Sequence, residues 1–338
     1  MLILSSPRFA RHVTPPGHPE RVERAHVFDT VASRWAQRGG AVAQPRAASV
    51  DELVRVHEAS YFDELASMAG RPAMLDADTF MSPETLDIAL LAAGATIQAT
   101  EHALDHHEPA FALVRPPGHH AEPGQAMGFC LFNNVAIAAA AALARGLQRV
   151  AIIDIDVHHG NGTQAMFYRD PRVLYVSTHQ HPFYPGTGAA AEVGSGEGQG
   201  FTVNVPMEAG CDDGDYLLVH RAIVEPVLES YAPQLTLVSA GYDAHDHDPL
   251  ASMRMSAGGY ATVIAELQRI ALRHGALALV TEGGYDLPAL AACLEASFAA
   301  IDRAGKTPAT TEPAAASSRG QRAVETARSV LTPYWREL

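Results

Sequence analysis

The most informative segment of the chain is VAIIDIDVHHGNG, residues 150–162. It opens as a continuous apolar run, which is typical of a buried strand. Since side chains along a strand alternate between its faces, Asp154, Asp156 and His158 are expected on one side. Three polar side chains inside a buried run are costly unless something compensates them, and a divalent cation would do so. The stretch therefore predicts a core strand whose carboxyl end carries a metal site, with Asp156 and His158 as ligands.

Outward from this strand, apolar runs and helix-like segments alternate along the whole chain. This alternation is typical of an α/β fold with three layers, α/β/α, and a mostly parallel central sheet. Ligand sites in such folds lie outside the carboxyl ends of the strands. The expected strands cover residues 2–4, 110–114, 150–157, 173–177, 202–205, 235–240 and 276–281. The expected helices cover residues 20–35, 83–104, 132–145, 215–231, 256–274 and 288–303, and Ser82 is a candidate cap for the second.

One domain and a tail account for the chain length of 338 residues. We assign residues 1–303 to a single catalytic domain and 304–338 to a linker and a helical tail. The linker prediction rests on the Ala-, Thr- and Pro-rich segment AGKTPATTEPAAASS, residues 304–318. Residues 320–331 then look helical, as a packed C-terminal arm or as a contact in a homo-oligomer.

Composition excludes several classes of protein. The chain is 47% hydrophobic and carries a formal net charge of −14, so it lacks the basic footprint of a nucleic-acid-binding protein and suits an anionic membrane poorly. No apolar stretch is long enough to span a bilayer, and no signal peptide is evident, so we expect a cytoplasmic protein. The three cysteines, Cys130, Cys211 and Cys293, are widely spaced, which predicts reduced, buried thiols.

A third metal ligand is expected where the run of residues 235–240 ends. Asp243 follows immediately at the carboxyl end of that strand. Two carboxylates and one imidazole leave a coordination position open, as in catalytic rather than structural sites. Zinc is the first choice, although an oxygen-rich set would also accept iron(II) or cobalt(II). The neighbouring His245, Asp246 and His247 fall in the following loop, which we expect to be solvated.

A pair of histidines supplies candidate acid–base groups. Pro116, Pro117 and Gly118 form a stiff turn that delivers His119 and His120 at the end of a strand. A general base must lie within hydrogen-bond reach of the attacking water. Each histidine also needs a partner on its other ring nitrogen. Two such partners are available: Asp154 for one histidine and Asn161 for the other.

Tyr285 is a candidate for polarising a substrate carbonyl. It follows two glycines at the end of the run of residues 276–281, so the backbone there can approach a ligand closely. A hydroxyl placed opposite the metal would stabilise negative charge that develops on the carbonyl oxygen. Alone, this motif is weak evidence for such a role. The predicted metal ligands and the histidine pair make the role more credible.

Taken together, the motifs resemble the histone deacetylase superfamily, over about residues 10–300. They are TPPGHPERVER (residues 14–24), RPPGHHA (115–121), GFCLFNN (128–134), DIDVHHGNGTQ (154–164), AGYDAHDHDPL (240–250) and EGGY (282–285). Asn161 stands where class I enzymes carry an aspartate, so the chain is similar to the class II branch and to bacterial deacetylase-like amidohydrolases. The resemblance implies the arginase-like α/β/α fold.

The resemblance also implies a role for each matching residue. Asp156, His158 and Asp243 match the zinc ligands, His120 the general base and acid, and His119 its electrostatic partner. Asp154 and Asn161 match the partners of these histidines, and Tyr285 matches the group that hydrogen-bonds the substrate carbonyl. Further matches are the walls of the acyl-lysine channel (Gly128, Phe129, Tyr184), its rim (Leu250), the internal acetate pocket (Arg24) and a structural potassium site (Asp154, Asp156, His158, Ser177).

The implied activity is hydrolysis of an acylated amine by activated water. The substrate is either an acyl-lysine peptide or a small acylated amine such as an acetylpolyamine. The acidic composition favours a polyamine, whereas the apolar Leu250 offers no carboxylate for a second ammonium group. Because Asn161 carries no negative charge, its partner histidine should be less basic than in class I enzymes.

Two alternative functions from other classes compete with the deacetylase hypothesis. A metal-binding sensor or scaffold without turnover would usually have lost His119, His120 or Tyr285, and all three are present. A ureohydrolase of the related arginase fold would need two manganese ions and more carboxylate ligands than the sequence offers. A deacetylase is therefore the preferred prediction.

Overall fold

The computed structural model describes residues 1–303 and 315–338 of the chain. Its centre is an eight-stranded sheet in the order β2-β1-β5-β10-β9-β6-β7-β8, in which every neighbouring pair is parallel. The strands are β1 (Leu2–Leu4), β2 (Ala41–Ala43), β5 (Ala110–Ala112), β6 (Val150–Asp154), β7 (Val173–Gln180), β8 (Thr202–Met207), β9 (Leu235–Ala240) and β10 (Ala276–Thr281). A separate antiparallel pair joins β3 (Ala73–Met74) and β4 (Phe80–Met81).

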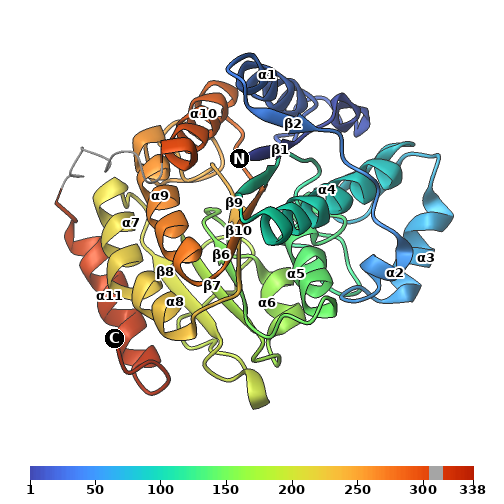
Figure 1. Cartoon of the computed structure of the whole chain (residues 1–338). Helices are drawn as coiled ribbons and strands as arrows, with labels where there is room; N and C mark the ends of the chain where they lie inside the picture. The colour runs from blue at the N-terminus through green and yellow to red at the C-terminus, as the bar shows by residue number, and fades with distance from the viewer. Residues whose placement is uncertain (304–314) are drawn as a thin grey trace.

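Helices cover both faces of the sheet (Figure 1). One face carries α4 (Thr85–His106), α5 (Asn134–Ala144) and α6 (Asn161–Phe167), with the short α2 (Val50–Leu53) and α3 (Ala59–Met68) beside them. The other carries α1 (Glu23–Gln37), α7 (Asp213–Val219), α8 (Glu225–Tyr231), α9 (Ala257–His274), α10 (Leu287–Arg303) and α11 (Ser318–Leu331). The predicted three-layer α/β/α fold is confirmed.

Two hydrophobic cores lie between these layers, and the alternation along each strand feeds both. In β6, Ile153 packs toward the α9–α10 side, whereas Ile152 packs toward α4 and α5. Phe111 and Ala112 of β5 divide in the same way. Because both faces of the sheet are covered, its strands are continuous apolar runs in the sequence.

All seven expected strands form, with differences at their ends. β6 stops at Asp154, three residues earlier than predicted, although the N–H of Ile155 still donates to the carbonyl of Ser239 in β9 at 3.0 Å. The predicted helix over residues 215–231 is interrupted by a π-helical turn at His220–Val224. The predicted cap at Ser82 is wrong: α4 starts at Thr85, and the Ser82 hydroxyl lies 2.8 Å from the Thr85 hydroxyl.

The C-terminal helix α11 packs against α7 and β8, at the edge of the sheet. The carboxylate of Asp215 accepts hydrogen bonds from the backbone and hydroxyl of Ser317, at 2.7 and 2.9 Å, and fixes the start of this helix. Trp335 donates to the carbonyl of Gly200 at 3.0 Å. The predicted linker falls largely on residues 304–314, which lie outside the described residues. Among the described helices, none has the length and apolar character required to cross a membrane.

Buried neutral histidines give the fold a predictable acid limit. Burial lowers the pKa of His57 and of His220 from 6.5 to about 4. The unfolded chain therefore binds protons between these values while the folded chain does not, so stability is complete above about pH 6.5 and falls as the pH drops toward 4. Each histidine should lower the free energy of unfolding by about 2 kcal/mol when the pH falls from about 7.5 to about 5.

His220 offers a clean test of this acid limit, because its Nε2 has no hydrogen-bond partner in the described part of the chain. His220→Leu should shrink the difference in unfolding free energy between the two pH values by about 2 kcal/mol. Urea unfolding at both pH values measures it, with the exposed His26→Leu as the control. An unchanged difference in the His220 variant would show that this histidine is not buried in its neutral form.

Candidate metal and catalytic site

Three buried side chains converge at the carboxyl end of the sheet. Asp156 and His158 follow β6, and Asp243 follows the adjacent β9. Nδ1 of His158 lies 3.1 Å from Oδ1 of Asp156 and 3.2 Å from Oδ2 of Asp243. One ligand atom from each residue lies within 4.8 Å of the others, so this set could hold a single metal ion.

The hydrogen bonds of these carboxylates fix their orientation. Oδ2 of Asp156 accepts from the backbone N–H of Gly283 at 2.8 Å, and Oδ1 of Asp243 accepts from that of Val157 at 2.9 Å. Burial alone would lower the pKa of His158, yet the hydrogen bonds and charges of Asp156 and Asp243 raise it to about 10. The pair of buried carboxylates therefore favours a positive charge at this point, which a metal cation would supply.

The structure resolves which partner belongs to which histidine. His119 donates from Nδ1 to Oδ2 of Asp154 at 3.0 Å, whereas Nδ1 of His120 lies 2.8 Å from Oδ1 of Asn161. The two rings are 4.0 Å apart, and the ring of His120 is 5.9 Å from that of His158. The predicted acid–base pair thus lies beside the candidate metal ligands.

The environments of the two histidines drive their protonation states apart. Burial lowers the pKa of His119, but the carboxylates of Asp154 and Asp156 raise it to about 10. For His120, burial and the neighbouring His119 and His158 hold the pKa well below its usual value. At neutral pH His119 is therefore charged and His120 is neutral, which leaves His120 able to accept a proton.

Tyr285 is held from two sides. Its backbone N–H donates to Oδ2 of Asp248 at 2.6 Å, and the guanidinium of Arg24 lies 5.1 Å from the centre of its ring. Arg24 is fully buried and donates from Nε to the carbonyl of Gly284 at 2.8 Å. In the described part of the chain, the Tyr285 hydroxyl has no hydrogen-bond partner, so it is free to meet a ligand.

The predicted channel residues surround these groups. A Cβ at Gly128, where φ is +57°, would lie 2.5 Å from Cδ2 of His120, so only glycine fits there. The ring of Phe129 lies 5.8 Å from that of Tyr285, and the ring of Tyr184 lies 5.2 Å from that of His120. Leu250 is half-buried, and its N–H donates to Oδ1 of Asp248 at 3.0 Å. The aromatic rings therefore flank His120 and Tyr285.

Sequence reasoning missed several buried acidic residues that support the site. Glu282 accepts from the N–H groups of Gly118 and His119, at 2.6 and 3.2 Å, and thereby ties the histidine turn to the end of β10. Burial raises its pKa to about 7. Asp248 anchors the Tyr285 backbone, as described above. Glu282 directly precedes the two glycines of EGGY, a position that could have marked it.

Glu20 is the other missed carboxylate. It is fully buried and bridges Arg24, at 2.9 Å, and Arg115, at 2.7 Å. Burial opposes its charge, but the cations of Arg115 and Arg24 and the ring of His12 hold its pKa well below the usual value. This network fixes Arg24 behind Tyr285, and only the three-dimensional structure reveals it.

Of the predicted potassium set, Asp154 and Ser177 are register partners on β6 and β7. Oδ2 of Asp154 is already bonded to His119 and to the hydroxyl of Tyr175 at 3.2 Å, and its Oδ1 accepts from the backbone N–H of Asp156 at 3.2 Å. The Ser177 hydroxyl lies 2.9 Å from Nδ1 of His179 and is buried.

His245, Asp246 and His247 form a second group that lies close enough together to hold a metal. Asp246 and His247 are exposed, and Nδ1 of His245 already accepts the backbone N–H of His247 at 3.2 Å. Each of the three cysteines is free and buried, as expected.

Comparison with known proteins identifies the family. The model of the histone deacetylase domain matches residues 18–301. A probable deacetylase of Archaeoglobus fulgidus is 41% identical over 285 residues, which are 82% of this chain and 79% of the relative. The histone deacetylase-like amidohydrolase of Pseudomonas aeruginosa is 42% identical over 82% of this chain and 74% of its own length.

A solved structure gives the same result. The crystal structure of the HDA15 HD domain superposes with a TM-score of 0.91 and 34% sequence identity, over 99% of this chain and 97% of that one. Family model, relatives and solved structure thus agree over the part of the chain that carries the site. The chain belongs to the histone deacetylase family and is a deacetylase or amidohydrolase of that family.

Proposed function

We propose that this protein removes an acetyl or other acyl group from the side chain of an acylated lysine, with one zinc ion held by Asp156, His158 and Asp243. The observation that carries the proposal is the buried convergence of these three ligands beside His120, whose ring lies 5.9 Å from that of His158. Mixed carboxylate and imidazole ligands with an open position suit catalytic zinc. Phe129 and Tyr184 supply aromatic walls for the aliphatic stem of a lysine.

When bound, the metal ion would polarise the amide carbonyl and make a nearby water more acidic. His120 takes a proton from the attacking water at Nε2, because Nδ1 faces Asn161. His119 is already protonated, so it stabilises the negative charge that develops during attack. The Tyr285 hydroxyl donates to the substrate oxygen. His120 then returns its proton to the leaving amine nitrogen, which releases acetate and the free amine.

We further propose a structural potassium ion near Asp154, Asp156, His158 and Ser177. The side-chain oxygens of Asp154 are engaged by His119, Tyr175 and the backbone N–H of Asp156, and those of Asp156 are engaged by His158 and Gly283. Main-chain carbonyl oxygens and the Ser177 hydroxyl would therefore hold the ion. Oxygen ligands of this kind suit a hard cation.

A small acylated polyamine is the second candidate substrate, and the charge at the site mouth favours it. Burial raises the pKa of Tyr184, and the nearby carboxylates of Asp78 and Asp76 raise it further. Negative charge beside the aromatic wall would attract a second ammonium group. Such charge would also attract a basic peptide, so only a direct comparison of the two substrates distinguishes the two candidates.

Acetate release from an acetyl-lysine peptide and from an acetylpolyamine, measured side by side, tests this proposal. We expect the wild type to prefer the peptide. Leu250→Glu should shift the ratio of kcat/KM toward the polyamine by about two- to fivefold, which corresponds to about 0.4–1 kcal/mol for one added charge at the rim. The matched control is Leu250→Gln, which has the shape of the glutamate without its charge. Release from the polyamine alone by the wild type would favour the second candidate.

A further inference from the structure

Asn161 makes different hydrogen bonds with the two ends of its amide group. Its Oδ1 lies 2.8 Å from Nδ1 of His120, and its Nδ2 donates to Oε1 of Glu122 at 2.7 Å. Nδ2 also lies 3.4 Å from the carbonyl of His120 and 3.1 Å from Sδ of Met127. The contact with Glu122 is the shortest of the four and the one that includes a formal charge.

The orientation of this amide decides which nitrogen of His120 carries a proton. An amide has nearly the same shape after rotation by half a turn, so only its hydrogen-bond partners fix the position of its oxygen. With Oδ1 toward His120, the imidazole must donate from Nδ1, which leaves Nε2 free to accept a proton. With Nδ2 toward His120, Nδ1 would have to accept, and Nε2 would carry the proton and could not act as a base.

We infer that Glu122 is a positioning residue, which holds Asn161 in the orientation that keeps Nε2 of His120 unprotonated. An ionised carboxylate accepts hydrogen bonds and cannot donate them. A rotated Asn161 would therefore place its oxygen against an oxygen of Glu122, and both would lose a partner. This inference rests on the proposed role of His120 as the base.

Hydrogen bonds hold the backbone around Glu122 in place, so its side chain has a defined orientation. Its N–H donates to the carbonyl of Gln125 at 2.9 Å, and its carbonyl accepts from Nδ1 of His57 at 3.1 Å. His57 is buried, and its Nε2 accepts from the N–H of Asn133 at 2.9 Å, so the ring itself is held in place. Glu122 thus approaches Asn161 from an anchored loop.

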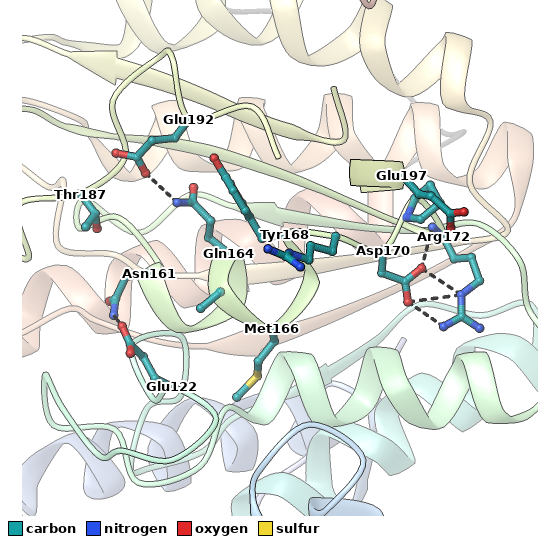
Figure 2. Close-up of a pocket in the computed structure, with 13 residues that line it drawn as sticks. Glu122, Asn161, Gln164, Met166, Tyr168, Asp170, Arg172, Thr187, Glu192 and Glu197 are labelled. Atoms are coloured by element: carbon teal, nitrogen blue, oxygen red, sulfur yellow. Dashed lines mark hydrogen bonds and ion pairs between the residues drawn. The ribbon is translucent and has the colours of Figure 1, made fainter. Parts of the chain in front are cut away.

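Glu122 reaches Asn161 from the side of an open groove, away from the metal ligands. This groove has a volume of about 930 Å³ and runs along α6 toward the Asp170–Arg172 ion pair. Figure 2 shows Glu122 and Asn161 at one end of the groove, joined by their hydrogen bond, and Glu197 farther along it. Glu122 is only half-buried there and lines the groove.

Glu122→Gln is the first test. Glutamine can donate or accept, so both orientations of Asn161 become satisfied, and part of the protein should hold His120 with its proton on Nε2. Loss of an orienting partner typically costs about 10–100-fold, so we expect kcat to fall about tenfold with KM unchanged. NMR of histidine-labelled protein reports which ring nitrogen is protonated and requires no turnover. Glu197→Gln, a carboxylate lining the same groove without an ion pair among the described residues, should change neither quantity.

The double variant Glu122→Gln/Asn161→Asp is the second test, because it exchanges the amide and the carboxylate. The new carboxylate at position 161 must then accept from both His120 and the new amide at position 122, so only one arrangement is satisfied. We expect its kcat to exceed that of either single variant, since Asn161→Asp alone places two carboxylates against each other. Glu122→Gln with unchanged kcat and an unchanged ring proton would overturn the inference. A wild type that releases no acetate would contradict the proposed function instead, and the NMR result would still test Glu122.

Discussion

His120→Ala should lower kcat by about 10²–10⁴-fold, the range typical of a lost general base. His120 is the neutral member of the pair, and its Nε2 has no partner in the described part of the chain. His119 cannot replace it, because the carboxylate of Asp154 accepts a hydrogen bond from its Nδ1 and raises its pKa, which favours the charged imidazolium. Acetate release under saturating substrate measures the effect.

Two comparisons make this result specific. His106→Ala removes an exposed histidine from the end of α4 and should leave kcat unchanged. The metal content of the His120 variant should match that of the wild type, because His120 is not among the metal ligands. If His120→Ala retained more than about a tenth of the wild-type rate, another group would be the base.

Asp243→Asn should remove most of the bound metal and, with it, the activity. Asparagine can still accept the N–H of Val157, so the loop after β9 keeps its hydrogen bond. The carboxylate charge that faces His158 at 3.2 Å is lost. Changes to residues that merely orient metal ligands cost about 10–100-fold in affinity, so a ligand itself should cost at least about 100-fold. Metal titration of the apoprotein measures this affinity.

Asp246→Asn is the matched control, because Asp246 is an exposed carboxylate three residues farther along the same loop. The affinity of the Asp246→Asn variant for the metal should equal that of the wild type. Equal affinities for the Asp243 variant and the wild type would contradict the assignment of this site. Loss of affinity in both variants would indicate that the metal binds at the group of His245, Asp246 and His247.

The strands of the fold were predictable because burial on both faces makes each of them a continuous apolar run. β9 and β10 form where the sequence indicates. β2 was missed because its apolar run, Ala41–Ala43, has only three residues, two of them alanine. The π-helical turn at His220–Val224 was missed because its residues keep the helical spacing of apolar side chains.

The residues of the site likewise include some that could be predicted from the sequence and some that could not. Asp156, His158 and Asp243 could be predicted because they follow buried strands that end at the same edge of the sheet. The pairing of His119 with Asp154 and of His120 with Asn161 needed the structure, since both partners were available to both rings. Glu20, Glu122 and Glu282 act through contacts with residues far from them in the sequence, which periodicity does not reveal.

Acetate release from an acetyl-lysine peptide, measured together with the zinc content of the same sample, tests whether this protein is a zinc-dependent deacetylase. The protein would be assayed as purified, after removal of metal with a chelator, and after zinc is restored. We predict that the rate follows the zinc content, with loss on chelation and recovery on restoration. A metal-free protein that keeps its full rate would contradict the account, and so would a zinc-loaded protein that releases no acetate.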